Sequence, residues 1–125
     1  MKINQLKVLG FIYQVIEDPQ MYKKRNASAT SCTNTLNITI DSSFPFPLQQ
    51  ESFIHEIIES LSYHLQLKLD HDTISRLSEG LFAIIKDNPE LLNFLAESYP
   101  ETTDNPDDNF VSKIINAKVV AGGAL

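Results

Sequence analysis

The sequence predicts an α+β fold in which a small antiparallel sheet packs against two principal helices. Two observations lead to this prediction. Residues of high strand propensity, partly in period-two alternation, fill much of the first forty positions. Apolar residues at three- and four-residue intervals then dominate positions 48–87, which is the periodicity of amphipathic helices. With 125 residues and 14.1 kDa, the chain has room for one domain with one core.

The first predicted strand is residues 7–16, which are rich in β-branched and aromatic side chains and end at Glu17-Asp18-Pro19. Gly10 is a candidate turn that divides this segment. The one basic cluster, Lys23-Lys24-Arg25, follows in what we expect to be a solvated loop. It has no interleaved aromatic residues and no second cluster beside it, so it does not indicate a binding patch.

A further strand is predicted within residues 29–40, where Leu36, Ile38 and Ile40 alternate with polar residues. Strict alternation indicates a strand with one buried face. Cys32 lies near the start of this segment or in a preceding strand. Because no base neighbours it, we expect the thiol to be a small buried side chain and not a nucleophile.

The first principal helix is predicted over residues 48–69, directly after the proline-containing stretch 42–47. Its apolar positions are Ile54, Ile57, Ile58, Leu61 and Leu65. Asp70 is the expected N-cap of a second helix, with an apolar stripe of Ile74, Leu77, Leu81, Phe82, Ile84 and Ile85. Asn88 is expected to cap that helix, and Pro89 to open a third, short helix that ends near Glu97.

These elements predict a domain over residues 1–97. Between Glu97 and Asp108 there are five acidic residues, two prolines and no basic residue, a composition typical of a linker, which we place at residues 98–109. Residues 110–125 are predicted to hold a weakly amphipathic C-terminal helix, to about residue 120, and a frayed tail.

The composition argues against several classes of function. A formal charge of −6 repels a phosphate backbone, so nucleic acid is not an expected partner. No apolar run approaches the roughly 20 residues that cross a bilayer, and no signal-peptide pattern opens the chain, so we expect neither membrane insertion nor secretion. The single cysteine fits a reducing cytoplasm. The four glycines, Gly10, Gly80, Gly122 and Gly123, cannot form a P-loop, a dinucleotide fingerprint or a nucleophile elbow.

Histidines and carboxylates remain as candidate chemistry, and they gather on the first principal helix. It carries His55-Glu56-Ile57-Ile58-Glu59, which differs from the metallopeptidase motif H-E-x-x-H at its last position. His55 and Glu59 lie about 40° apart around the helix, at roughly 100° per residue, so both can reach one ion. His64 lies about 180° from His55 by the same measure and cannot share that site.

Four segments carry a resemblance to a known family. They are Ile-Thr-Ile-Asp-Ser-Ser at residues 38–43, His-Glu-Ile-Ile at 55–58, Leu-Ser-Tyr at 61–63, and Ile-Ser-Arg-Leu-Ser-Glu-Gly-Leu-Phe-Ala-Ile-Ile-Lys-Asp-Asn-Pro at 74–89. In these segments, and over about residues 5–95, the chain resembles the small phage and prophage zincin-like proteins related to the ImmA/IrrE metallopeptidases. The resemblance implies a minimal zincin-like fold. The chain departs from the family pattern at Glu59.

In that family, two helix histidines and a glutamate at the start of the next helix hold zinc. Carried over by position, the resemblance implies His55 as the first ligand and Glu56 as the catalytic base. Glu59 stands at the position of the family's second histidine, and His71 stands at the position of the family's glutamate ligand. The implied ligand set is therefore His-Glu-His. Helical phase favours His71, which shares the inward stripe of the second helix, over Asp72, which stays open as an alternative ligand.

Two functions follow from the resemblance. The first is a phage-encoded zinc metallopeptidase-like protein, in which Glu56 acts as general base in peptide-bond hydrolysis. The alternative is a catalytically inactive relative that binds a protein or peptide partner, because a carboxylate at position 59 adds negative charge to the site and weakens the Lewis acidity of a metal. Either function is expected in the host cytoplasm. The sequence does not predict an oligomeric state.

Overall fold

The computed structural model describes residues 3–98, in the order two strands, a helix, two strands and three helices. A boundary between two units lies between Leu92 and Asn93, and the fold and the candidate site belong to the first unit. Apart from Ser98, the predicted linker at residues 98–109 lies outside the described residues. The predicted C-terminal helix and tail at residues 110–125 lie outside them as well and stay predictions.

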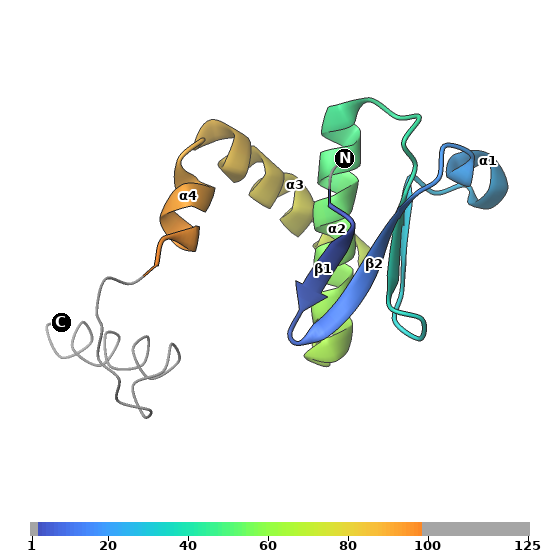
Figure 1. Cartoon of the computed structure of the whole chain (residues 1–125), viewed down its shortest axis with the longest axis horizontal. Coiled ribbons are helices and arrows are strands. Elements are labelled where there is room, and N and C mark those ends of the chain that lie inside the picture. The colour runs from blue at the N-terminus through green and yellow to red at the C-terminus, as the bar shows by residue number, and fades with distance from the viewer. Residues whose placement is uncertain (1–2, 99–125) are drawn as a thin grey trace, which may run out of the picture. The chain divides into compact units, whose positions relative to one another are not determined.

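The four described strands form one sheet, and this sheet is mixed (Figure 1). The strands are β1 (Gln5–Val8), β2 (Phe11–Glu17), β3 (Ala29–Cys32) and β4 (Asn37–Ile40), in the spatial order β1-β2-β4-β3. The α+β class is confirmed, but the antiparallel prediction is wrong for one pair, since β2 and β4 run parallel. Between these two strands the chain passes through a helix and β3, which supply the crossover that parallel pairing requires.

The predicted break at Gly10 is confirmed. β1 and β2 form an antiparallel hairpin, and its turn residues Leu9 and Gly10 have φ angles of 51° and 89°. Positive φ at both turn positions is the geometry of the tight hairpin turns whose twist matches that of the strands. Glycine adopts it at no steric cost.

The basic cluster is helical, so the expected loop is wrong. Helix α1 (Met21–Arg25) buries Met21 and carries Lys23, Lys24 and Arg25 in its last turn. Cations are favoured there because the carbonyl end of a helix carries partial negative charge. Asn26 ends the helix in the left-handed conformation, with φ of 56°.

Residues 29–40 form a hairpin of β3 and β4, and Cys32 is exposed, contrary to the expectation of burial. Successive strand residues point to opposite faces of a sheet. Ser31 pairs with Ile38, which is buried, whereas Cys32 pairs with Asn37, which is half-buried. The thiol therefore lies on the face of the sheet that points away from the core.

Helix α2 spans Phe46–His64, so it begins earlier and ends earlier than predicted. Pro45 occupies the N-cap and Pro47 lies in the first turn, where the missing N–H of proline costs no helical hydrogen bond. After the helix, Gln66 and Lys68 adopt left-handed φ angles of 56° and 55°, which stop it well before residue 69.

Helix α3 (His71–Asp87) has the predicted cap, because the Asp70 carboxylate accepts a hydrogen bond of 2.7 Å from the backbone N–H of Thr73. Asn88 caps its other end through hydrogen bonds to the Ile84 carbonyl. The short third helix, α4, spans Leu91–Ala96, so Pro89 precedes it instead of opening it. No helix within residues 3–98 has the length and apolar character needed to cross a bilayer.

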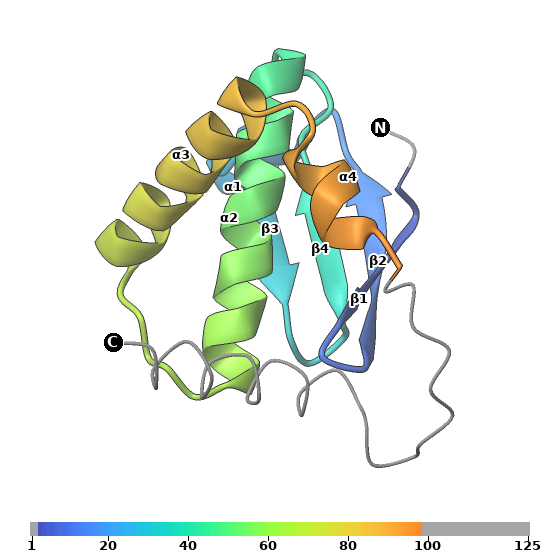
Figure 2. The same cartoon turned by 90° about the vertical axis from the view of Figure 1, so that its left-hand side faces the viewer.

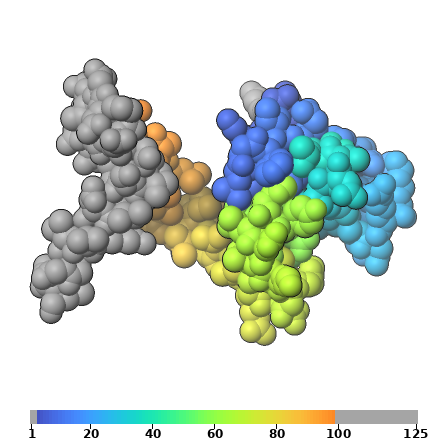
Figure 3. Space-filling model, turned by 90° about the horizontal axis from the view of Figure 1, so that it is seen from below, coloured from blue at the N-terminus to red at the C-terminus, as the bar shows by residue number. Residues whose placement is uncertain are grey.

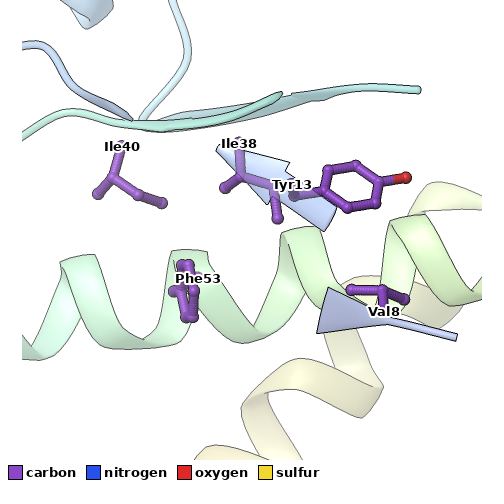
Figure 4. Close-up of a cluster of buried hydrophobic side chains, with 5 residues drawn as sticks. All are labelled: Val8, Tyr13, Ile38, Ile40 and Phe53. Atoms are coloured by element: carbon purple, nitrogen blue, oxygen red, sulfur yellow. The ribbon is translucent and has the colours of Figure 1, made fainter. Parts of the chain in front are cut away.

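Helix α2 runs along one face of the sheet and is flanked by α3 (Figures 1 and 2). The core lies between α2 and the sheet (Figure 4) and consists of Val8, Tyr13, Ile38, Ile40 and Phe53. The predicted alternation around Ile38 is confirmed, because Ile38 and Ile40 are buried between less buried neighbours. This arrangement leaves the opposite face of the sheet uncovered by α2 and α3.

The connection between β4 and α2 is held by a buried carboxylate. Asp41 accepts hydrogen bonds from the backbone N–H of Tyr22 at 2.8 Å, and from the backbone N–H and hydroxyl of Ser43 at 2.8 and 2.6 Å. These bonds, the one from the Ser43 hydroxyl most of all, hold the pKa of Asp41 below its usual value. Asp41 thereby ties α1 to the segment that leads into α2.

The two faces of the sheet predict a contrast in stability. Ile38→Ala removes a fully buried side chain and should lower the free energy of unfolding by about 2–5 kcal/mol. Ile12→Ala changes the same side chain on the open face, where it is 51% exposed, and should cost less than about 1 kcal/mol. Urea unfolding followed by circular dichroism measures both, and equal losses would contradict this account of the core.

Candidate metal centre

Three predicted ligands come together where α2 and α3 pack. His55 and Glu59 lie one turn apart on α2, and His71 is the first residue of α3. One ligand atom from each lies within 4.8 Å of the other two, and the His55 and His71 rings are 5.1 Å apart between centroids. The structure thus brings together the set His55, Glu59 and His71.

Local sequence explains why His71 faces α2. Ile74 and Ser78 are the buried residues of α3, and they lie three and seven positions after His71, on the same side of the helix. The Asp70 cap fixes where the helix begins. Asp72 is exposed and does not belong to the cluster, so the structure favours His71 over this alternative.

The cluster lies at the edge of the fold, with His55 and Glu59 half-buried and His71 exposed. Burial lowers the pKa of His55, and the neighbouring His71 lowers it further, against the opposing charges of Glu59 and Glu51. This lowered pKa favours the neutral form of the His55 imidazole. Neutral imidazole is the form that donates a lone pair to a metal.

Glu56 is buried beside the cluster, with 6% of its surface exposed. Burial raises its pKa to about 7, a hydrogen bond with the Ser31 side chain of β3 opposes this shift, and the charge of Glu59 adds to it. A carboxyl with a pKa near neutrality can both accept and return a proton. Glu56 has the ionisation behaviour expected of a general base.

His64 stands apart from the cluster, as its helical phase predicts. Its Nε2 shares a hydrogen bond of 2.6 Å with the Tyr13 hydroxyl, and its ring stacks on Phe11 at 4.1 Å between centroids. These contacts fasten the end of α2 to the β1-β2 hairpin, and Figure 3 shows the two segments side by side. The neighbouring Tyr63 is 59% exposed and lies on the wall of a different cavity, shared with Glu59.

The cluster opens into a cleft of about 550 Å³ between α1, the start of β3, α2 and α3. His55, Glu56 and His71 line it. The lining residues that sequence reasoning did not single out are Tyr22, Asn26, Ala27, Ser28, Ala29, Phe44, Leu48, Glu51, Ser52, Ser75, Ser78 and Glu79. Glu51 could have been predicted from its spacing, because it lies four residues before His55 and so on the same side of the helix. No pattern in the sequence marks Tyr22 or Phe44, because tertiary packing alone brings them there.

The donor set suits a zinc ion. Two imidazole nitrogens and one carboxylate oxygen are ligands that zinc takes in catalytic sites, and a tetrahedral ion with bonds of about 2.0–2.1 Å separates its ligand atoms by about 3.3 Å. Ligand atoms within 4.8 Å of one another reach that separation by small side-chain rotations. No protein-family model, curated protein or solved structure matches the chain.

The raised pKa of Glu56 predicts a pH-dependent gain in stability for Glu56→Gln in chelator-treated protein. Below about pH 4.5 the carboxyl is protonated in both the folded and the unfolded chain, so the two proteins should match. As the pH rises from the ordinary pKa of 4.5 through the folded value of about 7, ionisation favours the unfolded chain by up to about 3 kcal/mol. The glutamine variant escapes this loss and should be more stable at pH 8.

Urea unfolding at pH 4, 6 and 8 measures this difference. Glu90→Gln, which changes an exposed carboxylate outside the cleft, is the control and should show no comparable pH dependence. A stability difference of the same size at all three pH values would mean that Glu56→Gln acts through packing and not through ionisation.

Proposed function

We propose that this protein is a zinc metallopeptidase-like protein of the minimal zincin fold, akin to the small phage and prophage proteins related to the ImmA/IrrE family. The observation that carries the proposal is the convergence of His55, Glu59 and His71 to within 4.8 Å. The family resemblance, which rests on the sequence alone, implies the same three positions. The buried Glu56 on the wall of the same cleft supports the proposal further.

The residues of the site have separate roles in peptide-bond hydrolysis. His55, Glu59 and His71 would hold the ion, and a bound zinc supplies polarisation of a carbonyl and a lowered pKa for water. Glu56 accepts a proton from the attacking water and returns it to the nitrogen of the leaving amine. The Ser31 hydroxyl orients the Glu56 carboxyl through its hydrogen bond. The cleft would hold the peptide against these groups.

A second function is favoured by one specific observation, the carboxylate of Glu59 where the metallopeptidase motif has an imidazole. In this alternative the chain keeps the fold and the cleft, and it binds a protein or peptide without cleaving it. Zinc content and hydrolysis separate the two functions.

The metal site predicts stoichiometric zinc in protein purified without chelator or nickel affinity resin. Removal of one of three ligands should lower zinc affinity by about tenfold or more, so His55→Ala, Glu59→Gln and His71→Ala should each retain less zinc than the parent. His64→Gln and Asp72→Asn are matched controls that should keep it, because neither residue belongs to the cluster. Mass-spectrometric metal analysis gives the occupancy. A zinc-free parent protein would refute the metal site.

The general-base assignment predicts that Glu56→Gln keeps its zinc and loses hydrolysis by about 10²-fold or more. A quenched-fluorescence peptide library is the substrate, with Glu90→Gln as the control outside the cleft. Hydrolysis at the parental rate in Glu56→Gln would rule out this base. A zinc-loaded parent that cleaves no library peptide, while Glu59→His does, would favour the inactive binding protein.

A further inference from the structure

Away from the cluster, where a bound zinc ion would be positive, the charged side chains of the cleft are negative. Glu51 and Glu79 line it as carboxylates beyond the cluster and its neighbour Glu56, and no lysine or arginine stands among its described lining residues. The cavity of about 550 Å³ has room for side chains of a bound peptide. Such a cavity favours a cationic guest, because an anion brought near these carboxylates would be repelled.

Glu51 and Glu79 lie on the same sides of α2 and α3 as the candidate metal ligands. Glu51, His55 and Glu59 follow one another at four-residue intervals on α2, and His71, Ser75 and Glu79 do the same on α3. Residues at this spacing lie along one side of a helix. Glu51 is half-buried and Glu79 is exposed, so both remain accessible from the cleft. Glu51 lies four residues from His55, or about 6 Å along the helix axis.

The wall of the cleft also offers an apolar surface. Tyr22 of α1 and Phe44 of the segment before α2 meet edge to face, with ring centroids 5.5 Å apart, and Leu48 lies beside them in the lining. The Asp41 carboxylate accepts hydrogen bonds from the backbone N–H groups of Tyr22 and of Ser43, which directly precedes Phe44. It therefore holds the backbone next to both aromatic residues. The backbone that carries the two aromatic residues is therefore held in place by the fold itself.

From these observations we propose that the cleft selects an arginine or lysine side chain of a peptide. This inference rests on the proposed function for its substrate class. The aliphatic stem packs on Tyr22 and Phe44, as long cationic side chains do on apolar surfaces, and the charged head binds between Glu51 and Glu79. Glu51 lies about 6 Å from His55 along α2 and Glu79 about 12 Å from His71 along α3, so at about 3.3 Å per residue of an extended peptide the basic residue lies about two to four positions from the bond at the metal cluster.

Peptide binding tests the proposal without requiring turnover. The full chain carrying Glu56→Gln is titrated into fluorescein-labelled octapeptides of glycine and alanine that hold one arginine, one citrulline or one glutamate at the same central position. Citrulline keeps the shape of arginine and removes its charge. The arginine peptide should bind about tenfold more tightly than the citrulline peptide, and the glutamate peptide should bind more weakly than either.

Charge variants test whether Glu51 and Glu79 cause the preference for the arginine peptide. Adding Glu51→Gln and Glu79→Gln should remove the difference between arginine and citrulline, and Glu51→Lys with Glu79→Lys should reverse the order in favour of the glutamate peptide. Asp87→Asn with Glu90→Gln changes the net charge as much as the glutamine pair does, at exposed positions outside the cleft, and should leave the selectivity unchanged. Loss of selectivity in that control would overturn the proposal, since attraction would then be a property of the whole surface.

The remaining outcomes separate this inference from the proposed function. Equal binding of the arginine and citrulline peptides by a protein that hydrolyses library peptides with zinc overturns the selectivity and leaves the function. Tenfold selectivity for arginine in a protein that binds no zinc supports the cleft's preference and refutes the metallopeptidase.

Discussion

The structure depends on α2 being covered on two sides. On one side Phe53 packs against Ile38 and Ile40 of the sheet, which removes apolar surface from water. Elsewhere the helix buries small or polar residues, among them Ser52 and Ser60, and hydrogen bonds satisfy both hydroxyls. Small side chains let backbones approach closely, so α3 and β3 can pack beside α2 and bring His71 and Ser31 to it. The ligand cluster and the burial of Glu56 both depend on the packing of α2 against the sheet and against α3.

Local rules predicted much of the fold and part of the site. Period-two alternation located β4, Gly10 marked the hairpin turn, and Asp70 marked the start of α3. Helical spacing alone paired His55 with Glu59 and set His64 apart. The partner strand of β4 could not be predicted, because parallel pairing depends on the path of a crossover and not on the residues of either strand.

Other features could not be predicted because they arise from contacts distant in sequence. The family resemblance, and not the spacing of residues, identified His71 as a candidate ligand. Its position beside His55 results from the packing of α3 on α2. The burial of Glu56 depends on β3, which contributes Ser31. The exchange of positions between Glu59 and His71 preserves the donor set of two imidazoles and one carboxylate. In the proposed site, a bound zinc would therefore meet the same ligand charge as in the His-His-Glu arrangement, so His71 offsets the negative charge that Glu59 adds.

The close succession of α2 and α3 in the chain bears on the order in which the protein folds. The three candidate ligands belong to neighbouring helices joined by a short connection, so their meeting closes only a small loop. The parallel pairing of β2 with β4 must wait for α1 and β3 to be placed between them. Contacts of low sequence separation form with less loss of chain entropy. We therefore expect the helical pair that carries the candidate ligands to assemble ahead of the parallel strand pair, so the proposed site would form before the sheet is complete.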